Sequence, residues 1–192
     1  GVAFFGRDSE STLPVWSAKD GFPGDKVYRE FHKDLGWELP VSKLQEKGIS
    51  STRPLGLKFH KITDESIPLG DKEFYLESEA IKKTQEHADA YLLARSKQLE
   101  KLSLSSSFRP LLVAPFDAEL FGHWWYEGPI FLKNILKNSS RYSIKLTNLK
   151  EFLTPSPNLQ ICDPSPSSWG QGGYHNYLSL IHISEPTRLV SI

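Results

Sequence analysis

Residues 110–129 read PLLVAPFDAELFGHWWYEGP, a short apolar run that ends abruptly in a polar and aromatic motif. A continuous apolar run of this length is typical of a strand that is buried on both faces. In parallel α/β sheets and barrels, the loops after the carboxyl ends of the strands hold the active site. The sequence therefore predicts a strand over residues 110–116, with Asp117 at its functional end.

Residues 117–128, DAELFGHWWYEG, bring together the groups that sugar chemistry requires. They include three carboxylates, one imidazole and two indoles: Asp117, Glu119, Glu127, His123, Trp124 and Trp125. In glycoside chemistry one carboxyl protonates the leaving oxygen while a second attacks the sugar or activates water. Indoles pack against the flat C–H faces of pyranose rings. An isolated aspartate at a strand end is more often a helix N-cap, but these neighbours favour a catalytic role for Asp117.

Some of these side chains also admit a structural role. His123 could bond a sugar hydroxyl or orient a carboxylate, and it could equally be a satisfied core histidine. Glu119 and Glu127 could pair with basic neighbours on a solvated face, and we rank Glu119 higher because it lies closer to the strand end. No second histidine stands nearby at a ligand spacing, so neither a metal nor a cofactor is predicted.

Helical patterns flank this motif on both sides. The first covers residues 77–102, where apolar residues form one stripe between charged ones: Ile81, Ala88, Tyr91, Leu92, Leu99 and Leu102. Gly128 and Pro129 open the second helix, in which Phe131 and Leu132 are apolar. The order of helix, strand, loop and helix predicts an α/β fold, either layered or barrel-shaped.

The rest of the chain gives weaker patterns. We expect the end of a buried strand at 2–5, a polar loop at 6–13, and a loop shaped by glycine and proline at 14–25. Asp25 is placed to cap a helix that Gly36 would end. Short strands are possible at 56–62 and 144–146, and a short helix at 149–153. The glycine-rich stretch 167–177, SSWGQGGYHNY, is typical of a ligand-shaping loop or a tight packing corner.

Composition limits the kinds of partner. Lys plus Arg equals Asp plus Glu at 23 each, so neither a nucleic acid nor an acidic membrane surface is expected, and a neutral ligand fits better. Cys162 is the single cysteine, which suits a reducing compartment, with the cytoplasm as the default. No apolar run of membrane-spanning length and no signal-peptide pattern occurs, so no membrane association is predicted.

Three stretches together resemble glycoside hydrolase family 57. Residues 111–129 resemble the fourth sequence region of that family, and 15–40, VWSAKDGFPGDKVYREFHKDLGWELP, are similar to the segment after the nucleophile region. Residues 167–177 look like the fifth region, and all three stand in family order. The resemblance implies an α/β fold: the C-terminal part of an incomplete (β/α) barrel over 1–150, leading into a helical domain that begins over 151–177.

The resemblance also implies an activity and a site. The implied reaction is retaining transfer on α-1,4-glucans that forms α-1,6 branches, with an α-amylase, a 4-α-glucanotransferase or a non-catalytic glucan-binding homologue as alternatives. Asp117 would be the general acid/base and α-glucan the partner of a monomer. Trp16, Trp124 and Trp169 match aromatic substrate positions, and Glu119 and His123 complete the candidate site, whereas Trp37 is expected to pack.

Parts of the family pattern are absent. The nucleophile, a Glu of the third region, and the His-rich first region are not matched, so we expect a chain that starts within a longer protein and is inactive by itself. No basic residue stands over 11–14, before the VWS triplet. Residues 178–188, LSLIHISEPTR, read like a translated sequencing adapter, which predicts a non-native tail over 178–192, with a genuine short strand as the alternative.

Overall fold

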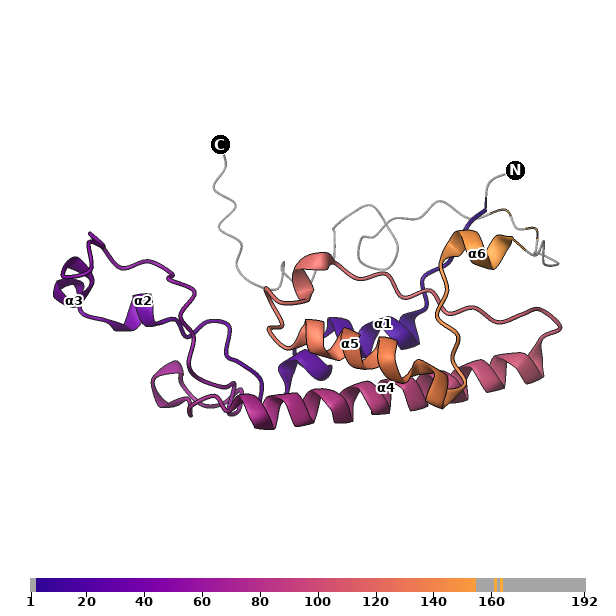
Figure 1. Cartoon of the computed structure of the whole chain (residues 1–192), viewed down its shortest axis with the longest axis horizontal. Coiled ribbons are helices and arrows are strands. Elements are labelled where there is room, and N and C mark those ends of the chain that lie inside the picture. Colours follow the sequence, from indigo (N-terminus) through magenta and orange to yellow (C-terminus); the bar gives the residue numbers. More distant parts are fainter. Residues whose placement is uncertain (1–2, 155–160, 162, 164–192) are drawn as a thin grey trace. The chain divides into compact units, whose positions relative to one another are not determined.

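The computed structural model describes residues 3–154, 161 and 163 (Figure 1). The chain divides into two compact units, of which the first ends at Thr147 and the second begins at Asn148. Within the described residues there is no β-strand, and strand-like pairing is limited to isolated bridges between single residues. The described part is therefore rich in helix. The glycine-rich stretch at 167–177 and the predicted tail at 178–192 lie outside it.

Two helices organise the first unit. The longer, α4, spans Glu77–Ser105, and α5, Gly128–Asn138, packs along it, which confirms both predicted helices. The buried stripe of α4 carries Ala88, Tyr91 and Leu92, as its apolar spacing predicts. Leu102 is exposed, so the stripe is covered over the earlier part of the helix and not at its end. No helix in the described part is long and apolar enough to cross a membrane.

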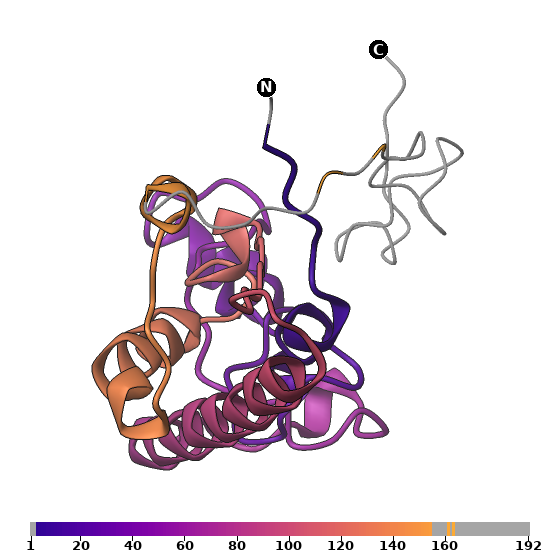
Figure 2. The ribbon, with the colours of Figure 1, turned by 90° about the vertical axis from the view of Figure 1, so that its right-hand side faces the viewer.

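Helix α1, Ser9–Trp16, replaces most of the polar loop predicted at 6–13. Asp8 caps it by accepting the Ser11 N–H at 2.7 Å. Pro14 lies inside the helix and cannot donate to the carbonyl of Glu10. Arg95 of α4 donates to that carbonyl instead, at 2.6 Å. A tertiary hydrogen bond thus stabilises a helix that local propensity disfavours, and α1 lies along α4 (Figure 2).

The helix predicted after Asp25 is wrong. The Asp25 side chain accepts the Val27 N–H in a local turn, and the chain then continues without a helix, with bends at Tyr28, Phe31 and His32. The Glu30 N–H donates to the carbonyl of His60 at 2.9 Å, and the Ile62 N–H donates to the carbonyl of Tyr28 at 2.8 Å. Pairing with residues 60–62 satisfies the backbone that a helix would have satisfied, so tertiary structure overrides the local pattern.

A short helix stands where the wrong one was expected to end. Helix α2, Leu35–Glu38, is capped by Asp34, whose carboxylate accepts N–H groups of Gly36, Leu55 and Gly56 at 2.8–2.9 Å. A Cβ at Gly36 would run into the carbonyl of Arg53, so glycine is required there by close approach, not as a helix terminator. Helix α3, Val41–Gln45, follows directly.

The strands predicted within the described residues are also wrong. Residues 3–5 and 144–146 are irregular, and the Ile144 N–H donates to the carbonyl of Ser139 at 3.1 Å. Residues 110–116 are extended and half-buried, and the Asp8 N–H donates to the carbonyl of Val113 at 2.8 Å. Residues 56–62 contribute single bridges. Apolar runs predict burial of an extended chain, but a strand also needs a neighbour along its length.

The remaining elements are short. Helix α6, Leu149–Leu153, confirms the prediction at 149–153, and the side chain of Asn148 caps it by accepting the Glu151 N–H at 2.9 Å. The described residues also contain four 3₁₀ turns: η1 Phe22–Gly24, η2 Leu69–Asp71, η3 Ala118–Leu120 and η4 Ser139–Tyr142. Turn η1 lies in the predicted glycine- and proline-shaped loop at 14–25.

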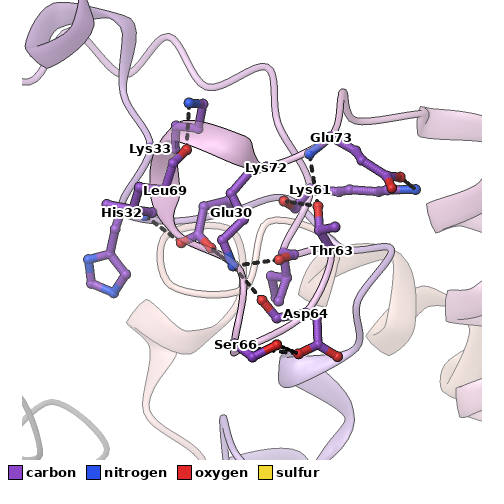
Figure 3. Close-up of polar contacts among 11 residues, drawn as sticks. Glu30, His32, Lys33, Lys61, Thr63, Asp64, Ser66, Leu69, Lys72 and Glu73 are labelled. Carbon is purple, nitrogen blue, oxygen red and sulfur yellow. Dashed lines mark hydrogen bonds and ion pairs between the residues drawn. The ribbon is translucent and has the colours of Figure 1, made fainter.

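Buried charges fix residues 26–34 against residues 60–73 (Figure 3). The Lys72 ammonium donates to the carbonyls of Ile62 and Asp64 at 2.6 and 2.7 Å and lies 3.5 Å from the Glu30 carboxylate. Lys33 donates to the carbonyl of Leu69 at 2.6 Å. These buried ammonium groups are each hydrogen-bonded, as burial of a charge requires. Two loops distant in sequence are therefore held together.

An aromatic core joins these parts. Trp125 lies with its ring centroid 5.0 Å from that of Phe131 on α5 and 5.5 Å from that of Tyr28, and Phe131 lies 5.7 Å from Tyr91 on α4. Trp125, Tyr28 and Phe131 are fully buried or nearly so. Burial of large rings is the main source of stability in a core of this kind.

We expect Trp125→Ala to lower the free energy of unfolding by about 3–5 kcal/mol, because it leaves a cavity between Tyr28 and Phe131. Urea denaturation of the purified protein measures this. Trp37→Ala is the matched control: Trp37 is 55% exposed, and its loss should stay within about 0.5 kcal/mol. Equal losses in the two variants would contradict this account of the core.

Candidate active site

The candidate loop, residues 117–128, folds back on itself. It begins with η3, and the Trp124 N–H donates to the carbonyl of Glu119 at 3.1 Å. The Trp125 N–H donates to the carbonyl of Leu120 at 2.8 Å, and the Gly122 N–H donates to the carbonyl of Trp125 at 2.8 Å. These bonds satisfy the loop from within, so its shape follows from its own sequence.

Two glycines are needed for that shape. Gly122 has φ +100°, a conformation that residues with a side chain rarely adopt. A Cβ at Gly128 would lie 3.0 Å from the Cα of Phe121, which is too close without a shift. The spacing of Gly122 and Gly128 in the motif therefore has a structural cause: one turns the chain, and the other lets α5 begin against the turn.

Residues 28–31, here called the clamp segment, contact the candidate loop through a hydrogen bond, a cation–ring contact and ring packing. The Arg29 N–H donates to Glu127 Oε1 at 3.0 Å, and the Arg29 guanidinium lies 3.6 Å from the ring centroid of Tyr126. Phe31 stacks on Trp124, with centroids 4.4 Å apart and planes at 29°. Together with the contact of Tyr28 and Trp125 described above, these contacts hold consecutive residues of the loop.

Asp117 is half-buried at the start of the loop. It makes no side-chain capping bond to η3, so the alternative role as a helix N-cap is wrong. Its Oδ2 is shielded from solvent and has no hydrogen-bond partner among the described residues. Buried carboxylate oxygens are normally paired, and an orphan at this position is characteristic of a functional group. The structure thus leaves Asp117 available for chemistry.

The other predicted site residues of the loop differ in exposure. His123 is exposed, so it is not a core histidine, and its ring meets Phe31 edge-on at 5.5 Å between centroids. Trp124 is half-buried and stacks on the same Phe31 ring. Glu119 is exposed. The loop therefore carries Asp117, Glu119, His123 and Trp124 together, while their roles in binding or catalysis stay predictions.

Two predicted residues lie apart from the loop in sequence. Trp16 ends α1 and is half-buried, with the Arg7 guanidinium 5.3 Å from its ring centroid. Trp169 lies outside the described residues. Trp37, expected to pack, is instead mostly exposed.

Glu127 differs most from its prediction. Its structural alternative was a carboxylate on a solvated face, but the side chain is 0% exposed and accepts the Arg29 N–H. Burial raises the pKa of Glu127, although that N–H and the nearby Tyr75 hydroxyl partly offset the effect. Burial also raises the pKa of Tyr75, and the Glu127 charge adds to this.

Sequence reasoning missed the clamp segment. Tyr28 and Phe31 fall in the helix predicted after Asp25 because they stand three residues apart, but in the structure both lie at bends of a non-helical segment. Arg29 and Tyr126 gave no signal of their own, because a cation that lies over a ring far away in sequence cannot be found from local pattern. Among the described residues, no group of three or more His, Cys, Asp or Glu could hold a metal ion.

Comparisons with known proteins give this loop a context. No family model matches the sequence. The chain is 33% identical over 176 residues to the 1,4-alpha-glucan branching enzyme of Thermococcus kodakarensis, covering 91% of this chain and 24% of that protein. The chain thus spans about a quarter of the length of this curated relative.

Solved structures agree with the sequence match. The alpha-amylase AmyC from Thermotoga maritima is 39% identical, with a TM-score of 0.79 over 88% of this chain and 33% of that one. The GH57-type branching enzyme from Pyrococcus horikoshii is 32% identical, with a TM-score of 0.73 over 89% of this chain and 29% of that one. The helix-rich arrangement of the described residues is therefore part of a known type of structure.

The solved branching enzyme from Pyrococcus is described as GH57-type, which places it among the glycoside hydrolases. Similarity over nine-tenths of the chain, in sequence and in structure, narrows the class further: the chain belongs to glycoside hydrolase family 57.

We expect Glu127→Gln to change how stability depends on pH. A carboxyl whose folded pKa is raised contributes stability that is complete below its unfolded pKa, near 4.5, and is lost as pH rises through the folded pKa. Glutamine keeps the acceptor for the Arg29 N–H and does not titrate. The variant should therefore gain stability relative to the parent from pH 4.5 to neutral pH.

Urea denaturation at a series of pH values measures this difference. Glu119→Gln is the matched control, because Glu119 is exposed and should give a nearly flat difference over the same range. A flat curve for Glu127→Gln as well would show that the buried carboxyl does not control the stability of the loop.

Proposed function

We propose that this chain is part of an enzyme that transfers glycosyl groups on α-1,4-glucans and forms α-1,6 branches, with retention of configuration. The observation that carries the proposal is the half-buried Asp117, whose Oδ2 is unpaired among the described residues, at the start of a loop that holds Trp124 against Phe31. The similarity to branching enzymes from Thermococcus and Pyrococcus supports it.

Asp117 acts as the general acid/base in this proposal. Its unpaired oxygen protonates the glycosidic oxygen in the first step and takes a proton from the attacking sugar 6-hydroxyl in the second. Trp124 seats a glucose ring, and His123 and Glu119, both exposed on the same loop, bond sugar hydroxyls. We also assign Trp16 and Trp169 to the binding of other glucose units of the glucan. No cofactor is needed for this chemistry.

A retaining reaction needs a second carboxylate about 5–5.5 Å from the first. Glu127 is committed to the Arg29 N–H, and Glu119 lies exposed two residues from Asp117, so neither is assigned this part. We assign the nucleophile to the third region of the family, which this sequence does not match. We also propose that the full-length enzyme contains an incomplete (β/α) barrel followed by a helical domain, and that it is a monomeric cytoplasmic protein.

Hydrolysis is the second candidate. The alpha-amylase AmyC has higher identity to this chain, 39%, than the branching enzymes compared above, 32–33%. An amylase and a branching enzyme share the acid and the covalent step, and they differ in whether water or a sugar hydroxyl accepts the glycosyl group.

Proton NMR of amylose incubated with the full-length protein distinguishes the two. Branching gives new α-1,6 linkages with few new reducing ends, because each cleaved bond is replaced by another. Hydrolysis gives new reducing ends without branches. If neither signal changes, the proposed transfer reaction is wrong.

We expect Asp117→Asn to reduce kcat at least about a hundredfold, because the amide has the same shape but donates no acidic proton. Binding of amylose should change little. Asp71→Asn, at an exposed turn, is the matched control and should keep the parent rate. Turnover of Asp117→Asn close to that of the control would end the assignment of the acid.

We expect Trp124→Ala to raise KM for amylose about tenfold and to lower kcat as well, because a stacking surface for the sugar is lost. Steady-state kinetics measure both constants. Trp37→Ala, which removes an exposed indole away from the loop, should change neither. An unchanged KM for Trp124→Ala would mean that its ring serves to pack against Phe31.

A further inference from the structure

An open groove is lined by residues from four separate stretches of the chain: Arg29; Gly56, Leu57, Lys58 and Phe59; Tyr75 and Glu77; and Tyr126. Arg29 belongs to the clamp segment and Tyr126 to the candidate loop, but none of the lining residues has a role in the proposed sugar site. The loops that form the groove are held in place by the buried Lys72 and Glu30 pair (Figure 3).

Aromatic rings supply the apolar part of the groove. Phe59 is 52% exposed and Tyr126 is 42% exposed, and both line the same groove. Tyr126 carries the Arg29 guanidinium on its ring, so it offers mainly its edge and its hydroxyl. Phe59 is left as the ring with the larger exposed fraction. Such rings accept the C–H face of a pyranose.

Two cations supply donors. The Arg29 guanidinium lies 3.6 Å from the ring centroid of Tyr126, and the Lys58 ammonium lies 3.7 Å from that of Phe31. Among the described residues, neither is within ion-pair distance of a carboxylate. Each is thus positioned by a ring, with its N–H groups left for other acceptors. Burial, together with the charge of Arg29, lowers the pKa of Lys58.

The groove also contains acceptors. Glu77 accepts only, whereas the hydroxyls of Tyr75 and Tyr126 both donate and accept. This mixture suits sugar hydroxyls, which do both. A phosphate or another anion would gain from the two cations but would meet the Glu77 carboxylate. The combination of donors, acceptors and an exposed ring, with a carboxylate that would repel an anion, therefore fits a neutral polyol as the ligand.

The groove is linked to the candidate loop through one ring. Phe31 stacks on Trp124 and also carries Lys58, so a residue of the proposed sugar site and a residue of the groove share a support. Tyr126 stands nine residues after Asp117 on the same loop. A glucan chain that is held at Trp124 can therefore reach the groove.

We propose that this groove binds a stretch of the same α-glucan away from the bond that is cleaved, and so sets the preference for long chains. The inference rests on the proposed function, because it takes its ligand class from it. Phe59 stacks on a glucose ring, and Arg29, Lys58 and Glu77 bond its hydroxyls. Short oligosaccharides that occupy only the site at Asp117 do not reach the groove.

The test compares Phe59→Ala with Phe74→Ala in the full-length protein. Both rings are exposed on neighbouring turns, but Phe74, 73% exposed, stacks on His60 and does not line the groove. The measured quantities are kcat/KM for amylose and for maltoheptaose, and the retardation of the protein in gels that contain amylose. Phe59→Ala should lower the ratio of the two kcat/KM values about fivefold and weaken retardation, whereas Phe74→Ala changes neither.

The outcomes separate this inference from the proposed function. An active parent whose chain-length preference is the same in Phe59→Ala overturns the groove and leaves the function standing. A parent that is retarded by amylose but does not transfer, with weaker retardation of Phe59→Ala, supports the groove and overturns the function. Protection of Lys58 from acylation by inorganic phosphate, but not by maltoheptaose, would make the groove an anion site and would also overturn the inference.

Discussion

The hydrogen bond from the Arg29 N–H to the buried Glu127 carboxylate is the contact on which the site depends. It joins the clamp segment to the candidate loop across 98 residues of sequence. Because Glu127 is fully buried, this acceptor has no water to replace its donor, and loss of the contact would leave a polar group unsatisfied. Around it, Tyr28 packs on Trp125 and Phe31 on Trp124, so one backbone bond sets the register of the ring contacts on both sides.

The clamp segment is itself held from behind. Residues 26–34 form no helix and would be a flexible loop if they were not paired with residues 60–62, and that pairing is fixed by Lys72, which bonds two carbonyls and Glu30. A buried ammonium with this set of acceptors fits one arrangement of the two loops and penalises others, since any shift leaves a charge unpaired. Lys72 therefore positions Glu30 and the clamp segment, and the clamp segment in turn positions the candidate loop.

Sequence predicted what depends on local pattern. The helices at 77–102 and from Gly128 were correct because their apolar residues recur at helical spacing, and the position of the chemical motif followed from its composition. The helix after Asp25, the loop replaced by α1, and the strands were wrong because each depends on a distant partner. Arg95 stabilises α1 despite Pro14, His60 pairs with the Glu30 backbone, and residues 110–116 have no strand beside them among the described residues. The same limit hid Arg29 and Phe31.

The clamp segment contributes one ring to the buried core and another ring to the surface near the candidate site. Tyr28 faces the core, where it is fully buried against Trp125, while Phe31 faces Trp124 and Lys58, both of which border open surface. The segment therefore separates a dry core that supplies stability from a wetter surface whose rings and cations can serve a ligand. A helix here would have turned both rings toward the same side, because they stand three residues apart. The non-helical course of the segment is thus what allows it to support the fold and the site together.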